Sequence, residues 1–284
     1  VDRYRLLKEK LCQFNGGKKI NIKTPRLAKF SELCLVHEEE YVSRFLEGSL
    51  SEKEIRRIGL KPWKAEIIPR TLRLVGGALD GLEELLKGAK IAANMAGGTH
   101  HAFRGEGAGY CIFNDLAVCA EVALQRKGIE RILVLDLDVH QGDGTAEIFY
   151  GDDRVYTVSL HGQNNFPFRK KTSDFDYGFE DGTGDEEYLR VLDVTLSRLE
   201  NEQFDLLFFQ AGVDGLASDA LGLLNLSPQG MKERNRRVFE WQRKQGKPML
   251  IFMGGGYAKP IGDTVDAFAD LFLMAAEKLS EYYL

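Results

Sequence analysis

The chain alternates short apolar runs with longer amphipathic stretches. The apolar runs are rich in β-branched and aromatic residues and predict strands at 33–37, 90–96, 131–140, 154–161, 205–211 and 248–253. The amphipathic stretches predict helices near 2–11, 39–48, 64–87, 114–127, 185–203, 228–245 and 261–279. Because nearly continuous apolar strands alternate with helices, we expect an α/β fold with a mostly parallel central sheet flanked by helices on both faces.

Composition narrows the class of protein. The 284 residues, 44% of them hydrophobic, show no dividing linker or repeat and suit a single domain over 1–284. The formal net charge of −5 disfavours a dedicated nucleic-acid binder, which usually has a basic surface. The four cysteines form no CxxC pair, which indicates reduced thiols in a cytoplasmic protein, or a nuclear one in a eukaryote. No apolar run has the length of a membrane span, so we expect no membrane contact.

Polar residues gather where the predicted strands end. In parallel α/β sheets the carboxyl ends of the strands lie along one edge, and ligands bind in the crevice there. We therefore expect four segments to meet at that edge, namely GGTHHA (97–102), DVHQGDG (138–144), GVD (212–214) and GGGY (254–257).

Asp138, His140 and Asp214 are candidate metal ligands. Asp136, Asp138 and His140 alternate along the apolar run 131–140, which places them on one face of a strand. Burying two carboxylates and an imidazole together is costly unless a partner compensates. With Asp214, the run supplies two oxygens and one nitrogen, a ligand set that suits catalytic zinc and also Fe(II), Mn or Co. For a single aspartate, capping a helix or binding loop amides is the simpler interpretation.

His100 and His101 predict a catalytic pair. Adjacent residues on an extended segment point in different directions, so the two rings do not suit one metal ion as joint ligands. A better fit is a pair that flanks a metal-bound water, with one ring as general base and acid. Each ring needs a partner that sets its tautomer, and Asp136 and Asp143 are available for this.

Tyr257 is a candidate hydrogen-bond donor to substrate. It follows three glycines, which allow a tight turn and a close approach to a ligand. Its hydroxyl can donate to a carbonyl or a developing oxyanion. Glycine runs after strands are common turns, so this segment gains weight only together with the other three.

Five segments together resemble the histone deacetylase family. They are GGTHHA, GYCIFND (109–115), DLDVHQGDG (136–144), QAGVDGLASDALG (210–222) and GGGY, and they occur in the family's order over nearly the whole chain. The resemblance is greatest to class IV and to bacterial histone deacetylase-like amidohydrolases. It implies the single-domain, three-layer arginase/deacetylase fold with about eight strands. It also leads us to expect the family's N-terminal strand before residue 1.

The resemblance implies two kinds of metal site. Asp138, His140 and Asp214 match the ligands of one catalytic Zn²⁺. Asp136 and Ser159, with nearby backbone carbonyls, match a structural K⁺ site.

The same resemblance implies the catalytic residues. His100 and His101 match the tandem histidines of the family, with Asp136 as the partner of His100 and Asp143 as the partner of His101. Tyr257 matches the tyrosine that polarises the scissile amide carbonyl.

A substrate site is implied as well. Gly109 matches a glycine whose carbonyl accepts the substrate N–H. Gly255, in the GGGY segment, is a further candidate substrate-binding residue. Tyr110 and Phe166 match the aromatic walls of a tunnel for acyl-lysine, although many members have Phe where Tyr110 stands.

The function that follows is zinc-dependent hydrolysis of the amide of an N-acyl-lysine in a protein or peptide. An amidohydrolase for acetylpolyamines or other acylated amines would use the same site. An arginase-like enzyme would need a binuclear manganese site with further aspartates. A non-catalytic acyl-lysine binder would keep the pocket and lose the chemistry, which the intact His100, His101 and Tyr257 disfavour. The sequence predicts no oligomeric state.

Overall fold

The computed structural model describes residues 2–14 and 20–281. The elements follow in chain order as α1 (Asp2–Phe14), α2 (Phe30–Leu33), α3 (Glu39–Leu46), α4 (Glu52–Ile58), α5 (Ile67–Leu86), β1 (Ile91–Asn94), α6 (Asp115–Leu124), β2 (Ile132–Asp136), α7 (Asp143–Ile148), β3 (Val155–Gly162), β4 (Phe175–Phe179), α8 (Asp185–Leu199), β5 (Leu206–Gln210), α9 (Pro228–Gln245), β6 (Met249–Phe252) and α10 (Ile261–Glu281).

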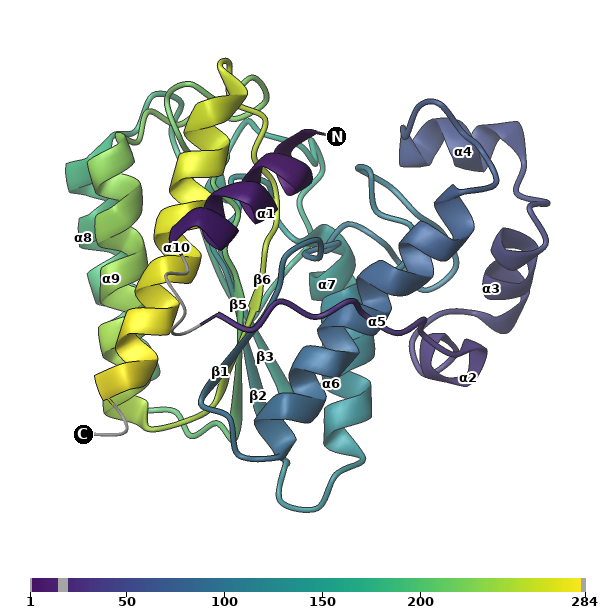
Figure 1. Ribbon diagram of the computed structural model, residues 1–284, viewed down its shortest axis with the longest axis horizontal. Coiled ribbons are helices and arrows are strands. Elements are labelled where there is room, and N and C mark those ends of the chain that lie inside the picture. The colour runs from purple at the N-terminus through teal and green to yellow at the C-terminus, as the bar shows by residue number, and fades with distance from the viewer. Residues whose placement is uncertain (1, 15–19, 282–284) are drawn as a thin grey trace.

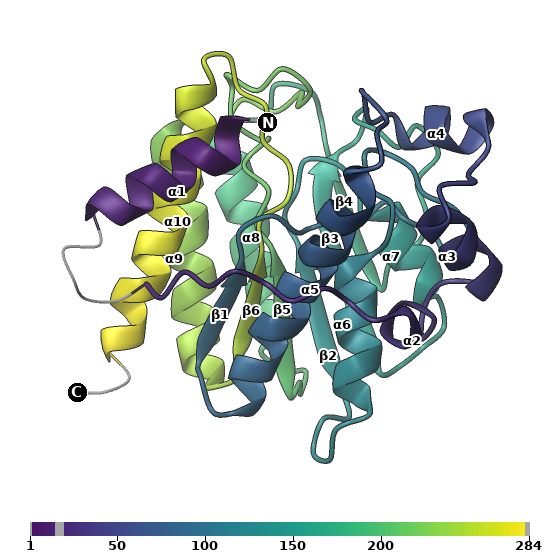
Figure 2. The same cartoon turned by 45° about the vertical axis from the view of Figure 1, so that its right-hand side comes forward.

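The strands of the described residues form one parallel sheet between two layers of helices. Its six strands lie in the order β1-β6-β5-β2-β3-β4. Helices α1, α8, α9 and α10 cover one face and α5 and α6 the other (Figure 1), and the turned view shows the same layers (Figure 2). The predicted three-layer α/β architecture is confirmed, with six strands where the resemblance implied about eight.

Each central strand contributes side chains to two hydrophobic cores. In β2, Leu133 and Leu135 belong to the core beneath α8, α9 and α10. Ile132 and Val134 belong to the core beneath α5 and α6. This alternation follows from the two-residue period of a strand, and burial on both faces explains why the sequence is continuously apolar there.

The prediction of a strand at 33–37 is wrong. Helix α2 ends at Leu33, and the chain then turns towards α3. Leu33 and Val36 are 0% and 3% exposed, and both belong to the core on the α5 side. Residues three apart share one side of a helical turn, so burial of that side produces an apolar run. A run this short does not distinguish a strand from a buried turn.

Strand β2 is shorter than the predicted strand 131–140. It ends at Asp136, whose Oδ1 accepts a hydrogen bond of 3.1 Å from the backbone amide of Asp138. Asp138 and His140 therefore lie in the loop after the strand. The sequence placed Asp136, Asp138 and His140 on one face of a strand, but only Asp136 lies in the strand.

Besides α2, three short elements were not predicted. Helices α4 and α7 have seven and six residues, too few for a clear helical period. Strand β4 lies at the edge of the sheet, and four of its five residues are partly or fully exposed, so its pattern resembles a loop. None of the helices in the described residues combines the length and the hydropathy that crossing a membrane requires.

Helix α9 begins where the sequence predicts. The Ser227 side chain accepts a hydrogen bond of 2.9 Å from the Gly230 amide, and Pro228 occupies the first turn. Both features are typical helix starts, because they satisfy or remove backbone donors that have no partner within the helix. The helix packs against α8 and α10 and places its buried side beneath the ends of β2 and β5.

Candidate metal centre and active site

Four loops meet at the carboxyl ends of adjacent strands. Strands β1, β6, β5 and β2 are neighbours in the sheet, and the loops after them carry GGTHHA, GGGY, GVD and DVHQGDG. Residues from all four loops line one cavity of about 550 Å³. The structure therefore brings the predicted segments together at one edge of the sheet.

Asp138, His140 and Asp214 converge in this cavity. One potential ligand atom of each lies within 4.8 Å of those of the other two. His140 Nδ1 is 3.1 Å from Asp138 Oδ1 and 3.2 Å from Asp214 Oδ2. The side chains of both aspartates are almost completely buried, at 1% and 0% exposure.

Backbone groups orient the two carboxylates. The Gly255 amide donates to Asp138 Oδ2 over 2.7 Å, and the Val139 amide donates to Asp214 Oδ1 over 3.0 Å. A Cβ atom on Gly255 would collide with Asp214 Oδ2, so only glycine allows this approach. Each carboxylate thus keeps its other oxygen on the side of His140.

The charges of these residues fit a divalent cation. Burial and the neighbouring Asp138 carboxylate raise the pKa of Asp214 to about 6. Burial lowers the pKa of His140, but its hydrogen bonds with Asp138 and Asp214 outweigh this and raise it to about 10. The proton on His140 thus offsets the two carboxylates, and a bound metal ion would replace that proton, because a ligating imidazole is neutral. Two buried carboxylates this close repel each other unless a cation lies between them. Two carboxylate oxygens and one imidazole nitrogen are a donor set that zinc accepts.

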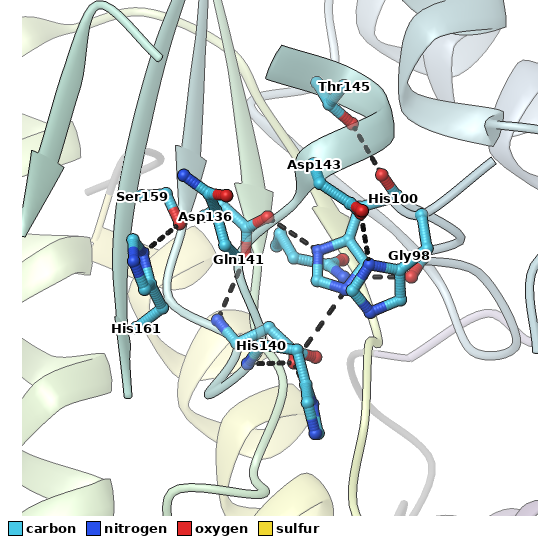
Figure 3. Close-up of polar contacts among 12 residues, drawn as sticks. Gly98, His100, Asp136, His140, Gln141, Asp143, Thr145, Ser159 and His161 are labelled. Carbon is cyan, nitrogen blue, oxygen red and sulfur yellow. Dashed lines mark hydrogen bonds and ion pairs between the residues drawn. The ribbon is translucent and has the colours of Figure 1, made fainter. Parts of the chain in front are cut away.

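His100 and His101 each bind their own aspartate. His100 Nδ1 is 2.7 Å from Asp136 Oδ2 (Figure 3). His101 Nδ1 is 2.7 Å from Asp143 Oδ1, and both are the predicted pairings. The centroids of the two imidazole rings are 4.1 Å apart. Each carboxylate accepts a hydrogen bond from the Nδ1–H group of its histidine, which leaves Nε2 of that ring for other partners.

The two histidines differ in charge although their partners are of the same type. Burial lowers the pKa of His100, but the carboxylates of Asp136 and Asp138 raise it more strongly, to about 9. Burial and the positive charge of His100 lower the pKa of His101 to about 4, against the opposing effect of Asp143. At neutral pH the site therefore holds one cationic ring beside one neutral ring.

Tyr257 stands at the cavity and is fixed by two contacts. Its backbone amide donates to Asp219 Oδ2 over 2.6 Å. The guanidinium of Arg3, from α1, lies 4.7 Å from the centroid of the Tyr257 ring and donates to the Gly256 carbonyl over 2.7 Å. Burial raises the pKa of Tyr257 to about 12, although Arg3 acts in the opposite direction. Its hydroxyl is thus a hydrogen-bond donor at neutral pH.

The residues predicted to form the substrate tunnel lie together at the cavity. Gly109, Tyr110 and Phe166 line it, and the ring centroids of His101 and Phe166 are 4.9 Å apart. Gly109 has φ +53°, and a Cβ there would meet the His101 ring at 2.6 Å. Tyr110 also has a positive φ, of 68°, and its ring is 47% exposed at the cavity entrance. The turn at these two residues thus brings Gly109 close to the His101 ring, and the Gly109 carbonyl accepts a hydrogen bond from Cys111 Sγ over 3.4 Å.

Asp136 and Ser159 lie side by side on β2 and β3, as their paired register shows. The Ser159 hydroxyl is 2.9 Å from His161 Nδ1, and both residues are buried (Figure 3). The K⁺ site that the resemblance implies at Asp136 and Ser159 stays a prediction.

Residues outside the predicted set support the histidine segment. Asp115 accepts hydrogen bonds from the backbone amides of Gly98 and Thr99, and Gln210 Nε2 donates to the Gly98 carbonyl over 2.9 Å. Asp115 lies in the GYCIFND segment and Gln210 at the end of an apolar strand. The sequence feature that could have revealed both residues is a polar side chain within an otherwise apolar stretch.

The chain is similar to known proteins over nearly its whole length. The sequence model described as histone deacetylase domain matches residues 1–270. The chain belongs to the histone deacetylase family. This member is 43% identical to an uncharacterized protein of Picosynechococcus sp. over 266 residues, which are 93% of this chain and 88% of that protein.

Named histone deacetylases are similar over most of this family member. Histone deacetylase 2 of Arabidopsis thaliana is 31% identical over 255 residues, which are 85% of this chain and 66% of that protein. Histone deacetylase 8 of Xenopus tropicalis is 30% identical over 281 residues, which are 92% of this chain and 72% of that protein.

Solved structures of the family have the same fold. The crystal structure of an HDAC homolog from Aquifex aeolicus matches with a TM-score of 0.82 and 28% identity, over 98% of this chain and 77% of that one. A structure of an HDAC homolog complexed with SAHA matches equally well. This histone deacetylase family member therefore has the arginase/deacetylase fold and belongs to a family of hydrolases.

Proposed function

We propose that this chain is a zinc-dependent amidohydrolase that removes the acyl group from an N-acyl-lysine. The observation that carries the proposal is the convergence of three metal-binding side chains and two His–Asp pairs on one cavity of about 550 Å³. A metal that activates water, beside a histidine that can move protons, is a combination that hydrolyses unactivated amides.

Asp138, His140 and Asp214 would hold the zinc ion. When bound, zinc supplies a Lewis acid and lowers the pKa of water towards about 7. The remaining steps belong to side chains and backbone groups of this chain, which position the substrate, move protons and stabilise charge.

His101 would act as the general base and then as the general acid. Because its Nδ1 binds Asp143 and its pKa is lowered to about 4, its Nε2 carries a free electron pair at neutral pH. His101 takes a proton from the attacking water and returns it to the nitrogen of the leaving amine as the C–N bond breaks, so that amide and water become a carboxylic acid and a lysine amine, which ionise to carboxylate and ammonium. His100, held in the cationic form beside Asp136, stabilises the negative charge that develops.

Tyr257 and Gly109 would hold the two ends of the scissile amide. The Tyr257 hydroxyl donates to the carbonyl oxygen, and the hydrogen bond strengthens as that oxygen gains charge. The Gly109 carbonyl accepts the amide N–H of the substrate. Tyr110 and Phe166 would flank the apolar stem of the acylated lysine, because both line the cavity.

The charges at the cavity favour an acyl-lysine over an acetylpolyamine. Among the described residues that line the cavity, Asp138 and Asp214 supply the carboxylates, and both belong to the proposed metal site. Arg57 and Arg70 also line it, the former paired with Glu106 over 2.7 Å. Arg3 lines the cavity too, so a polycationic substrate would find three arginines and no further carboxylate on these walls, which disfavours its binding.

A turnover screen tests the proposal. Acetyl-lysine peptides, longer acyl-lysine peptides and N-acetylspermidine are incubated with the purified protein, and the released carboxylate is measured, with the His101→Gln variant as background. We expect hydrolysis of an acyl-lysine peptide that a chelator abolishes and zinc restores. Turnover of the acetylpolyamine alone would support the amidohydrolase for acylated amines instead. Binding of the peptides without turnover would contradict the enzymatic proposal.

A further inference from the structure

Helix α9 carries an arginine that is completely buried beneath the metal-binding loops. Arg234 is 0% exposed. Its Nη1 donates to the carbonyls of Leu137 and Gly212 over 3.3 and 2.5 Å, and its Nη2 donates to the Ala211 carbonyl over 3.2 Å. The remaining guanidinium donors bind the side-chain oxygen of Asn235. Within the described part of the chain, these acceptors are carbonyl and amide oxygens rather than carboxylates.

The carbonyls that Arg234 binds belong to the two loops that carry the metal-binding aspartates. Leu137 directly precedes Asp138, and Gly212 lies two residues before Asp214. The Gly212 backbone also touches the other loop, since a Cβ on Gly212 would collide with Asp138 Oδ2. One side chain therefore bridges the ends of β2 and β5 at the point where both carboxylates leave the sheet.

The charge of Arg234 complements these carboxylates. A buried guanidinium without an ion pair is costly, so its retention requires compensation from elsewhere in the structure. Burial lowers the pKa of Arg234, while Tyr188 and the negative charges of Asp214 and Asp138 act in the opposite direction. The acidic pair and the arginine thus stabilise each other across a single layer of backbone carbonyls.

We propose that Arg234 is a positioning residue of the metal centre, which fixes the spacing of Asp138 and Asp214 through the backbone and so determines how tightly the site holds its metal. The inference rests on the metal site of the proposed function. It concerns metal binding alone, so its test does not depend on which acylated substrate the enzyme hydrolyses.

The test measures zinc affinity in Arg234→Met and Arg234→Lys by competition with a chromophoric chelator. Residues that orient metal ligands typically contribute 10–100-fold to metal affinity, so we expect a loss of about 10–100-fold for the methionine variant. Lysine keeps the charge but cannot reach three carbonyls as a planar fork, so we expect a smaller loss. The absorption spectrum of the Co²⁺-loaded variants should also change, because the angle between the carboxylate ligands changes.

Val238→Ala is the matched control. Val238 lies one turn further along α9 and is 0% exposed, so its truncation weakens the packing of the same helix. Its apolar side chain donates no hydrogen bond to the metal-binding loops. We expect wild-type zinc affinity and an unchanged Co²⁺ spectrum in this variant.

Each outcome decides one of the two claims. Wild-type zinc affinity in a folded Arg234 variant overturns the inference, as does a loss equal to that of the control. Failure of both Arg234 variants to fold would also overturn it, in favour of a purely structural role. Failure of the wild-type protein to bind zinc would instead refute the proposed metal site.

Discussion

His100 and His101 illustrate how neighbouring side chains acquire different roles. Both rings are buried and both bind an aspartate over 2.7 Å. The carboxylates of Asp136 and Asp138 raise the pKa of His100 against burial, whereas burial and the positive charge of His100 lower the pKa of His101. Environments that push two pKa values apart separate acid from base, so this asymmetry supports His101 as the proton-transfer group.

Replacing Tyr257 with phenylalanine removes the proposed oxyanion donor and leaves the ring beneath Arg3. Loss of one such donor typically costs about 10²–10³ in rate. We expect Tyr257→Phe to fold and bind zinc as the wild type does, with kcat for an acetyl-lysine peptide lower by this factor. Steady-state kinetics and a zinc assay on the same preparation check this. A kcat near that of the wild type would exclude the hydroxyl from catalysis.

Residues in the predicted motifs could be assigned from sequence, but their buried supports could not. Asp138, His140 and Asp214 stand out because charged and imidazole groups at strand ends have few other uses. Arg3 and Arg234 lie in polar helical segments, DRYRLLKEK and KERNRR, where most charged side chains face water. Nothing local marks the one arginine of each segment that turns inward, since burial depends on what packs against the helix.

At the scale of elements, His37 joins three segments that are distant in sequence. It lies in the turn between α2 and α3, and its Nδ1 donates to the Phe103 carbonyl over 2.9 Å. Its Nε2 accepts from the backbone amide of Asn114, which caps α6. The acceptor role requires a neutral ring, and burial lowers the pKa of His37 to about 4.

This contact predicts that stability depends on pH. The pKa of His37 is lower in the fold than its ordinary 6.5, so its contribution is complete above pH 6.5 and is lost as the pH falls towards 4. We expect the difference in unfolding free energy between wild type and His37→Gln to shrink by about 2 kcal/mol from pH 7 to pH 5. Urea denaturation at both pH values measures it. A difference that stays constant with pH would contradict the assigned neutral state.

Most long elements follow from periodicity, and the exceptions have physical reasons. The five strands predicted from 90 onwards are present. Strands β2, β3, β5 and β6 are buried along nearly their whole length and read as continuous apolar runs, and the edge strand β1 keeps an apolar sequence although Ala93 is exposed. The run 33–37 is apolar because a helical turn is buried there, and β4 escapes detection because it lies at an exposed edge. An apolar run indicates that a segment is buried. It indicates a strand only where the buried segment lies inside the sheet.

For the whole molecule, strand order decides where the chemistry lies. The four segments after β1, β6, β5 and β2 are adjacent because those strands are adjacent. Sequence patterns predict a common edge through the parallel arrangement. They do not predict which strands are neighbours, because pairing depends on contacts between residues far apart in the chain.

The most direct test of this account measures zinc content and acetyl-lysine peptide hydrolysis together, in wild-type protein and in Asp214→Ala. Asp214 is fully buried and supplies one of the three proposed ligands. We predict stoichiometric zinc and hydrolysis in the wild type, and loss of both in the variant, with a circular dichroism spectrum like that of the wild type. Stoichiometric zinc in folded Asp214→Ala, or wild-type hydrolysis after complete removal of metal, would contradict the account.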